Sequence, residues 1–429
     1  MSLVLDERER GLLAGDSGPG AALAMRLVVR AAEALRAERL IPITSAHVDS
    51  CLYHGEATVD FVERLVNGGA QVSVPTTLNV GALDLLHPEL WRGDVRTAER
   101  GRLLMDRYRA LGCQPTYTCA PYQLSFARPA LGEQVAWAES NAIVFCNSVL
   151  GARTERYGDF TDIACAITGL VPDAGLHRTD ARRATVVMRL APDIPAALLD
   201  DDALYPVLGI VLGRRAGGRV AAIDGLPAGQ SEDRLKAVGA AAASSGSVAM
   251  FHAVGSTPEA ATLDAALQGG LPDATVEIGL AELRAARDEL TTAAGGGAPG
   301  TPIGTVSLGT PHASLAELRA VERELAGARP AAGVELMVST GRHLLAEAGE
   351  EGLARRLRAQ GVELLVDTCS YIAPVLRPSP LPAMTDSGKW AFYAPGNIGV
   401  EVIFGSLREC VRSAVRGSVW RDPDLWGAA

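Results

Sequence analysis

Residues 334–369 read VELMVSTGRHLLAEAGEEGLARRLRAQGVELLVDTC, and this stretch decides the fold class. The apolar runs at 334–338 and 362–366 are rich in Val and Leu and have the length of buried strands, whereas 351–360 has the periodicity of an amphipathic helix. A strand, a helix and a second strand in succession are typical of a parallel β–α–β unit. We therefore expect an α/β protein with largely parallel sheets.

The same alternation of helical and strand-like sequence is present near the N-terminus. Helical periodicity over 21–39 is followed by a strand-like run at 40–43, and a helix predicted over 58–67 is followed by a strand-like run at 71–74. A charged helix is predicted over 96–111. The α/β pattern is therefore expected to extend over the whole chain.

The predicted elements divide into three lobes. At 429 residues the chain is longer than one average domain. A Gly- and Ala-rich stretch at 293–300 has too few large side chains to pack, and it predicts a flexible loop or linker. A dense group of polar motifs ends near 178–183. We therefore predict lobes over 1–180, 181–300 and 301–429.

Composition disfavours several classes of function. A net charge of −10 argues against nucleic-acid or anionic-membrane partners, which need a basic surface. No apolar run reaches the ~20 residues of a membrane span, and the N-terminus lacks the pattern of a secretion signal, so a cytoplasmic location is expected. In that compartment the seven cysteines are not expected to form a disulfide framework. Without a C-x-x-C pair a zinc finger is also disfavoured, and most of the cysteines are expected to be small buried hydrophobes.

Two polar segments follow predicted strands, which is where the ligand sites of α/β folds lie. In the first segment, His47 and Asp49 are close enough in sequence to orient each other for proton transfer, although Asp49 could instead cap a helix beside an exposed histidine. In the second, Thr76, Thr77 and Asn79 offer neutral hydrogen bonds to a carboxylate. The same three residues could instead form a helix N-cap.

A third segment is unusually polar for a packing element. The apolar run at 142–146, predicted as a strand, is followed by Asn147, Ser148 and Arg153. Such side chains beyond the end of a strand could recognise an anionic group through charge-assisted hydrogen bonds. Arg153 could equally be an ordinary surface residue.

Three late segments carry cysteine or lysine. The strand predicted at 362–366 leads to Cys369, the next segment contains Ser387 and Lys389, and Cys410 lies at the start of a predicted helix.

Taken together and in order, these motifs resemble the aconitase X family, a branch of the aconitase superfamily. The resemblance extends from about residue 15 to 417. The motifs are AHVD at 46–49, PTTLN at 75–79, CAPY at 119–122, ESN at 139–141, NSVLGART at 147–154, TGLVP at 168–172, GLH at 175–177, DTC at 367–369, SGK at 387–389 and EC at 409–410. The resemblance implies aconitase-like three-layer α/β/α lobes with mixed, largely parallel sheets around a central cluster site.

The resemblance also implies an iron–sulfur cluster held by three cysteines, which correspond here to Cys119, Cys369 and Cys410. Thiolates suit such a cluster, whether [4Fe–4S] or [2Fe–2S], and three ligands leave one position open for a substrate hydroxyl. The alternative is three unrelated buried cysteines. The chain departs from the family pattern at Thr310, where the family often has cysteine, and at Asp16, where it prefers glutamate.

The implied activity is dehydration of a small hydroxy carboxylate by a large, catalytic subunit. The residues expected to hold the carboxylate or phosphate groups are Arg153, Lys389, Thr76, Thr77, Asn79, Asn147 and Ser148, with Ser387 also expected in the substrate site. His47 and His177 are candidates to protonate or orient the leaving hydroxyl. The family's small swivelling subunit supplies a serine-bearing loop that acts as the base, so this chain alone is expected to be inactive.

Family members include cis-3-hydroxy-L-proline dehydratases and mevalonate 5-phosphate dehydratases, and both substrates carry a hydroxyl β to a carboxylate. The Ala-, Gly- and Arg-rich composition favours a bacterial source and hence cis-3-hydroxy-L-proline. A cluster-free binding or regulatory relative is the alternative from another class. A Rossmann oxidoreductase is disfavoured because no G-x-G-x-x-G follows a predicted strand.

Overall fold

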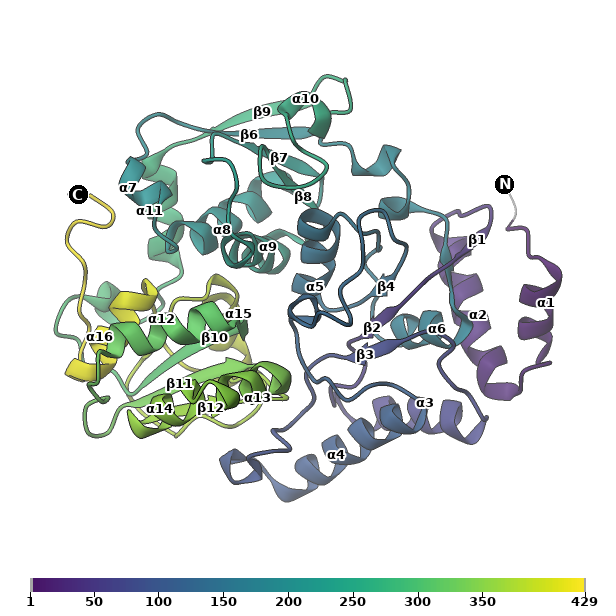
Figure 1. The fold of residues 1–429 in the computed structure, drawn as a ribbon, viewed down its shortest axis with the longest axis horizontal. Helices are drawn as coiled ribbons and strands as arrows, with labels where there is room; N and C mark the ends of the chain where they lie inside the picture. The colour runs from purple at the N-terminus through teal and green to yellow at the C-terminus, as the bar shows by residue number, and fades with distance from the viewer. Residues whose placement is uncertain (1–2, 428–429) are drawn as a thin grey trace. The chain divides into compact units, whose positions relative to one another are not determined.

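The computed structural model describes residues 3–427 and shows helices alternating with mostly parallel strands (Figure 1). The chain forms two compact units. Within the described residues, unit 1 consists of residues 3–83 together with Asp94–Arg183, and unit 2 consists of Asp84–Gly93 and residues 184–427. Unit 2 thus contains both lobes predicted beyond residue 180. The predicted α/β class is confirmed.

Unit 1 is built on a parallel sheet of three short strands in the order β3-β2-β4. These strands are β2 (Ala46–Val48), β3 (Thr76–Leu78) and β4 (Ala136–Trp137), and all of their residues are buried. A second pair, β1 (Leu40–Pro42) and β5 (Leu170–Pro172), is antiparallel. The helices are α1 (Glu7–Ala14), α2 (Pro19–Ala34), α3 (Glu56–Asn67), α4 (Val95–Ala110), α5 (Ser140–Phe145) and α6 (Thr161–Thr168).

The structure places three predicted helices of unit 1 close to their expected bounds, as α2, α3 and α4. Two predicted strands are wrong. Residues 71–74 form no strand, because their amides reach scattered partners such as the Leu111 and Ala166 carbonyls, and β3 begins only at Thr76. The run at 142–146 is helical, because the Glu139 side chain caps α5 at the amide of Ala142. A short, fully buried apolar run carries no periodicity that could distinguish the two structures.

Unit 2 contains two parallel sheets. The first has the order β8-β7-β6-β9, and the second has the order β12-β11-β10-β13-β14. The strands of the first sheet are β6 (Val186–Leu190), β7 (Ala221–Asp224), β8 (Phe251–Ala253) and β9 (Ala274–Ile278), and those of the second are β10 (Thr305–Ala313), β11 (Glu335–Thr340), β12 (Val362–Leu365), β13 (Ala383–Thr385) and β14 (Val402–Phe404). The helices are α7 (Ala196–Leu199), α8 (Leu204–Ala216), α9 (Glu232–Gly246), α10 (Leu263–Ala266), α11 (Leu280–Glu289), α12 (Leu315–Leu325), α13 (Arg342–Glu350), α14 (Leu353–Ala359), α15 (Gly388–Ile398) and α16 (Leu407–Arg416). The strand–helix–strand unit predicted from 334–366 is present as β11, α13 with α14, and β12.

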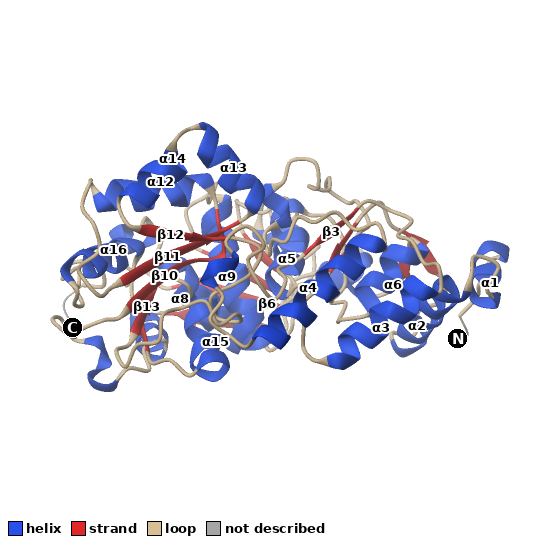
Figure 2. Cartoon of the chain, turned by 90° about the horizontal axis from the view of Figure 1, so that it is seen from below, coloured by secondary structure: helices blue, strands red, loops and turns tan. Residues whose placement is uncertain are grey.

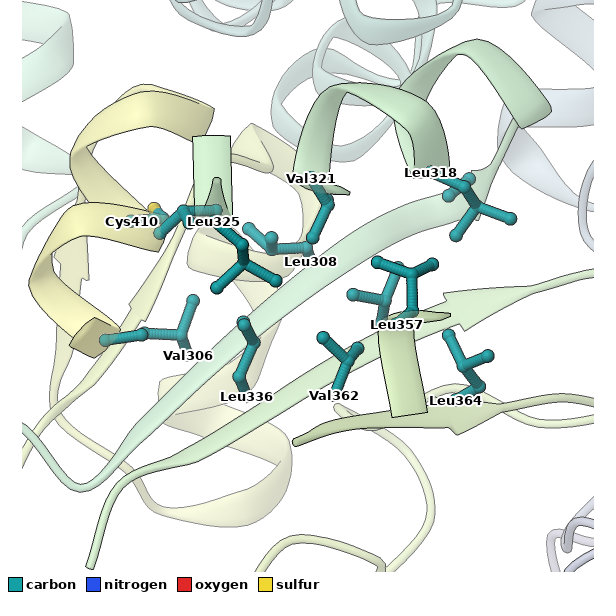
Figure 3. Packing of buried hydrophobic residues seen from close by; sticks show 14 of the residues in the cluster. Val306, Leu308, Leu318, Val321, Leu325, Leu336, Leu357, Val362, Leu364 and Cys410 are labelled. Carbon is teal, nitrogen blue, oxygen red and sulfur yellow. The ribbon is translucent and has the colours of Figure 1, made fainter. Parts of the chain in front are cut away.

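The five-stranded sheet is covered on both faces. Figure 2 shows α12 and α14 on one face and α15 on the other. The apolar core of the first face is made by alternate strand residues such as Val306, Leu308 and Leu336, which pack against Leu318 and Leu357 of the helices (Figure 3). Since β10 lies at the centre, with β11 on one side and β13 on the other, the strand order changes direction between β10 and β13.

Among the helices of residues 3–427, none combines the length and the apolar character needed to cross a lipid bilayer.

Candidate active site

The polar motifs of unit 2 lie at the carboxyl ends of the five-stranded sheet. β10 ends in residues 310–313, β12 is followed by 366–370, and β13 is followed by 386–389. Because β10 pairs directly with β13, and with β12 through β11, these segments lie at one edge of the sheet. This edge is where α/β sheets bind their ligands.

A histidine and a cysteine come together at this edge. A ring nitrogen of His312 and the thiol sulfur of Cys369 lie within 4.8 Å of each other, and both side chains are buried. His312 Nε2 is 3.2 Å from the Thr368 carbonyl oxygen. A neutral imidazole that donates there keeps Nδ1 as an electron-pair donor, which is the usual arrangement around metal-binding histidines. An imidazole nitrogen and a thiolate are suitable iron ligands.

The backbone around Cys369 is held rigidly. Ser370 Oγ is hydrogen-bonded to Ser307 Oγ at 2.7 Å and accepts from the Trp390 indole N–H at 3.0 Å. On the other side, Asp367 has a left-handed φ of 64°, and its carboxylate accepts two hydrogen bonds from Arg342, at 2.7 and 2.5 Å. These hydrogen bonds fix the backbone on both sides of Cys369, so the side chain is already oriented before it binds a metal.

Sequence reasoning did not select His312. The motif at 309–312 drew attention only because Thr310 stands where the family often has cysteine. The signal that could have identified His312 is a histidine at the end of a buried strand, two residues beyond that departure.

The structure does not bring Cys410 into this group. Cys410 lies on α16 within the apolar core, close to Leu308 and Leu325 (Figure 3). Its sulfur is 3.8 Å from the Gly405 carbonyl oxygen, and burial raises its pKa well above the ordinary value. Among the described residues, the potential ligand atoms grouped within 4.8 Å of one another around His312 and Cys369 do not include the Cys410 sulfur. We therefore correct the predicted ligand set at Cys410: this side chain packs as a small hydrophobe.

Ser387 and Lys389 lie at the start of α15. The Ser387 hydroxyl caps this helix by accepting from the Trp390 amide at 3.0 Å, and it also donates to the Thr310 carbonyl oxygen. Its hydrogen-bonding capacity is thus used to join the ends of β10 and β13. Lys389 is buried and lines a cavity next to Ser387.

In unit 1, His47 occupies the centre of the three-stranded sheet. The side chain is fully buried, Nδ1 is 2.8 Å from Thr77 Oγ1, and the ring lies 5.9 Å from that of Trp137. Nε2 has no hydrogen-bond partner among the described residues. Burial lowers the pKa of His47 to about 3. The imidazole is therefore neutral near pH 7.

Asp49 follows β2, and its pKa is raised whereas that of His47 is lowered. Its carboxylate accepts a hydrogen bond from the Asn79 amide. Burial, and then the negative charge of Glu139, raise the pKa of Asp49 to about 8. Asp49 is therefore protonated near pH 7, unlike an ordinary aspartate. Thr76 lies on β3, the strand that pairs with β2, and its hydroxyl donates to the Val74 carbonyl oxygen at 2.8 Å.

Cys119 is held by a buried polar network. The Asn141 side-chain amide donates to the Cys119 carbonyl oxygen at 2.6 Å and to Glu139 at 3.0 Å, and it accepts from the Tyr122 hydroxyl at 2.9 Å. Glu139 itself has a left-handed φ of 72°, a strained conformation for a residue with a side chain. Glu139 and Asn141 belong to the motif at 139–141, yet they were not predicted as site residues.

Asn147 serves the fold through both ends of its side chain. The amide group donates to the Thr154 carbonyl at 2.9 Å, and the oxygen accepts from the Thr154 amide and from Arg182, at 3.1 and 3.0 Å. The fully buried Arg182 also bonds the Asn147, Ala152 and Leu176 carbonyl oxygens. The neighbouring Ser148 is buried on a π-helical turn.

Arg153 and His177 lie together, on the wall of a surface depression of unit 1. Arg153 donates to the His177 carbonyl oxygen and to Thr179 Oγ1, both at 3.0 Å. Both ring nitrogens of His177 are engaged, with Gln134 and Tyr157 at 2.6 Å each, and burial lowers its pKa to about 4. These contacts fix the positions of both side chains, and their roles in the substrate site stay predictions.

Sequence comparison matches the chain to three consecutive family descriptions. They are "Aconitase X first domain" over residues 2–180, "Aconitase X second domain" over 184–288 and "Aconitase X third domain" over 303–416.

Several curated proteins are similar along nearly the whole chain. A cis-3-hydroxy-L-proline dehydratase of Pseudomonas aeruginosa is 43% identical over 96% of this chain and 70% of its own length. One of Hypocrea jecorina is 40% identical over 97% of this chain and 69% of its own length. The phosphomevalonate dehydratase large subunit of Methanothermobacter thermautotrophicus is 34% identical over 95% of this chain and 98% of its own length.

A solved structure has the same fold. The crystal structure of Thermococcus kodakaraensis aconitase X in its holo-form superposes with a TM-score of 0.82 at 30% identity, covering 96% of this chain and all of that one.

Proposed function

Because this chain belongs to the aconitase X family, we propose that it is the catalytic chain of a dehydratase that removes water from cis-3-hydroxy-L-proline. The observation that carries the proposal is the 43% identity to the Pseudomonas aeruginosa cis-3-hydroxy-L-proline dehydratase over 96% of the chain. The phosphomevalonate dehydratase large subunit of Methanothermobacter thermautotrophicus is more distant, at 34%.

The donors in unit 2 support an iron–sulfur cofactor. His312 and Cys369 offer an imidazole and a thiolate at the ligand-binding edge of the sheet, and Cys119 stays a predicted ligand from the family resemblance. Cysteine and histidine ligands are compatible with a [2Fe–2S] or a [4Fe–4S] cluster. A bound iron would supply a Lewis acid that weakens the bond between the substrate carbon and its hydroxyl.

The residues of unit 1 support proton transfer to the leaving hydroxyl. Asp49, protonated near pH 7, can give up a proton, whereas the neutral His47 can only orient a partner through Nε2. Two titratable groups with pKa values moved apart by their surroundings are typical of acid–base sites. We therefore assign the proton-donating role, for which His47 and His177 were candidates, to Asp49. Lys389, Thr77 and Ser148 remain candidates to hold the substrate carboxylate.

In this proposal, full activity requires a small partner subunit. The chain covers 98% of the Methanothermobacter relative, which is named a large subunit, but only 70% of the Pseudomonas relative. That subunit would provide the proton acceptor.

The test is reconstitution. The chain is purified without oxygen, supplied with iron and sulfide, and mixed with a candidate small subunit; cis-3-hydroxy-L-proline and 5-phosphomevalonate are then offered separately. We expect visible absorbance from thiolate-to-iron charge transfer, and turnover of cis-3-hydroxy-L-proline by the pair alone.

Three outcomes would contradict parts of the proposal. Turnover of phosphomevalonate alone would reassign the substrate, and full activity of the isolated chain would remove the need for a partner. A protein that stays colourless and inactive after reconstitution would favour a cluster-free binding relative.

A further inference from the structure

The hydroxyl groups of Thr368 and Ser339 lie completely buried at the carboxyl edge of the five-stranded sheet. Thr368 follows β12, and Ser339 lies near the end of β11, the strand that pairs with β12. Neither hydroxyl oxygen has a hydrogen-bond partner among the described residues. A buried hydroxyl that makes no hydrogen bond destabilises the fold, so two of them at a ligand-binding edge call for an explanation.

The nearby hydroxyl groups are satisfied or line a cavity. Thr340, which follows Ser339 on β11, donates to the Ala313 carbonyl oxygen at 2.7 Å. Thr310 has no hydrogen-bond partner among the described residues, but it lines a cavity of about 310 Å³ that is large enough to hold water. Neither Thr368 nor Ser339 lines that cavity. Their hydroxyls therefore need a partner of another kind.

Thr368 lies directly beside the metal donors of unit 2. It precedes Cys369 in the chain, and its carbonyl oxygen is 3.2 Å from His312 Nε2. A ring nitrogen of His312 and the Cys369 sulfur lie within 4.8 Å of each other. A group bound by this histidine and this cysteine would thus lie next to Thr368.

Ser339 lies on the face of the sheet that the segment after Cys369 covers. Side chains alternate along a strand, so Ser339 shares its face of β11 with Met337. Met337 belongs to a buried apolar cluster with Ala373 and Val375. The Ser339 hydroxyl is therefore on the same side of the sheet as the segment that begins at Cys369, and one step closer to the carboxyl edge than Met337.

A negatively charged sulfur atom is a partner that suits both hydroxyls. His312 and Cys369 are the groups of unit 2 to which the proposed function assigns an iron–sulfur cofactor. The sulfide and thiolate sulfurs of such a cluster accept hydrogen bonds, and these bonds help to set its reduction potential. They stabilise the reduced state more than the oxidised state, because the reduced cluster carries more negative charge. Hydrogen bonds around metal ligands also strengthen metal binding.

We propose that the Thr368 and Ser339 hydroxyls donate hydrogen bonds to sulfur atoms of the iron–sulfur cluster bound through Cys369, and that these bonds raise its reduction potential and slow its loss. The inference rests on the cofactor of the proposed function and adds two groups that stabilise its negative charge in a buried place. Both are positioning residues, since they act on the substrate only through the cluster.

The experiment measures the cluster directly. The chain is reconstituted with iron and sulfide in the absence of oxygen as wild type, Thr368→Val, Ser339→Ala and Thr257→Val. The reduction potential is read from the visible absorbance against redox dyes, and the release of iron to a chelator is timed. Thr257→Val is the matched control, because Thr257 is buried in the same unit but its hydroxyl donates to the Ala253 carbonyl oxygen at 3.2 Å.

We expect Thr368→Val and Ser339→Ala each to shift the reduction potential to more negative values and to release iron about 10-fold faster, as the loss of a hydrogen bond to a charged group does. Thr257→Val should leave both quantities unchanged. In the iron-free chain, Thr368→Val and Ser339→Ala should melt no lower than wild type, because the hydroxyls they remove have no partner within residues 3–427. Thr257→Val should melt lower.

Unchanged potentials and release rates in both variants, with an intact cluster in the wild type, would overturn the role of the two hydroxyls and leave the cofactor in place. The role would also be overturned if the iron-free variants melted as far below wild type as Thr257→Val, because the hydroxyls would then bind only an internal water or a protein group. A wild-type chain that assembles no cluster would overturn the cofactor of the proposed function, and this inference with it.

Discussion

Burial moves the pKa values of His47 and Asp49, two residues apart on β2 and its end, in opposite directions, to about 3 for His47 and to about 8 for Asp49. Asp49 is protonated up to about pH 8, so its acid form is present at neutral pH and is lost as the pH rises through that value. We predict that kcat of the reconstituted enzyme falls above about pH 8. Asp49→Asn should lower kcat by about 10²- to 10⁴-fold, the usual contribution of a general acid.

The pH profile of kcat provides the measurement. Asp60→Asn is the matched control, because Asp60 is an exposed residue of α3 in the same unit and its replacement changes the net charge equally. A fall above pH 8 that persists unchanged in Asp49→Asn would assign the proton to another group.

The cysteines make a second prediction at the scale of residues. Cys369→Ser should abolish iron binding, measured by iron content and visible absorbance, because the hydroxyl is a poor iron ligand. Cys410→Ala should keep the iron and lower the free energy of unfolding by about 1–2 kcal/mol, since it removes one buried atom from the core around Leu308 and Leu325. Loss of iron from Cys410→Ala would return Cys410 to the ligand set.

At the scale of elements, α9 and α12 are joined by the buried Lys236, which binds Asp233 and Glu317. Replacing Lys236 by methionine leaves two carboxylates buried without a cation. We predict that Lys236→Met lowers the free energy of unfolding by about 3–5 kcal/mol in urea.

An exposed ion pair supplies the comparison. Arg356 of α14 contacts Glu322 of α12 at 2.5 Å, with about half of the arginine side chain exposed. Arg356→Met should cost less than about 1 kcal/mol, because water screens such pairs. Similar decreases in the free energy of unfolding for the two variants would show that burial of Lys236 adds nothing to the stability that its ion pairs provide.

At the scale of the whole molecule, the chain enters unit 2 twice. Residues 84–93 leave unit 1 and dock on unit 2, where the buried Asp84 accepts from the Val366 amide at 2.9 Å and from the amides of Leu86 and His87 at 2.8 Å each. Asp84→Ala removes these acceptors. We predict a loss of about 2–3 kcal/mol in unfolding free energy, and faster proteolytic cleavage within 84–93 than in wild type. An unchanged cleavage rate would mean that apolar contacts of Leu90 and Trp91 hold the segment without Asp84.

Local sequence determined the α/β class, the helices α2, α3 and α4 of unit 1, the strand–helix–strand unit over 334–366 and the motif residues that identify the family. Burial periodicity and turn chemistry are properties of neighbouring residues. Only the tertiary structure decided which motif residues meet. It brought His312 close to Cys369, placed Cys410 in the core, and gave Asn147 and His177 internal hydrogen-bond partners. These outcomes depend on the order in which strands pair and on the face to which each side chain points. Both are settled by contacts between distant segments, which no local pattern records.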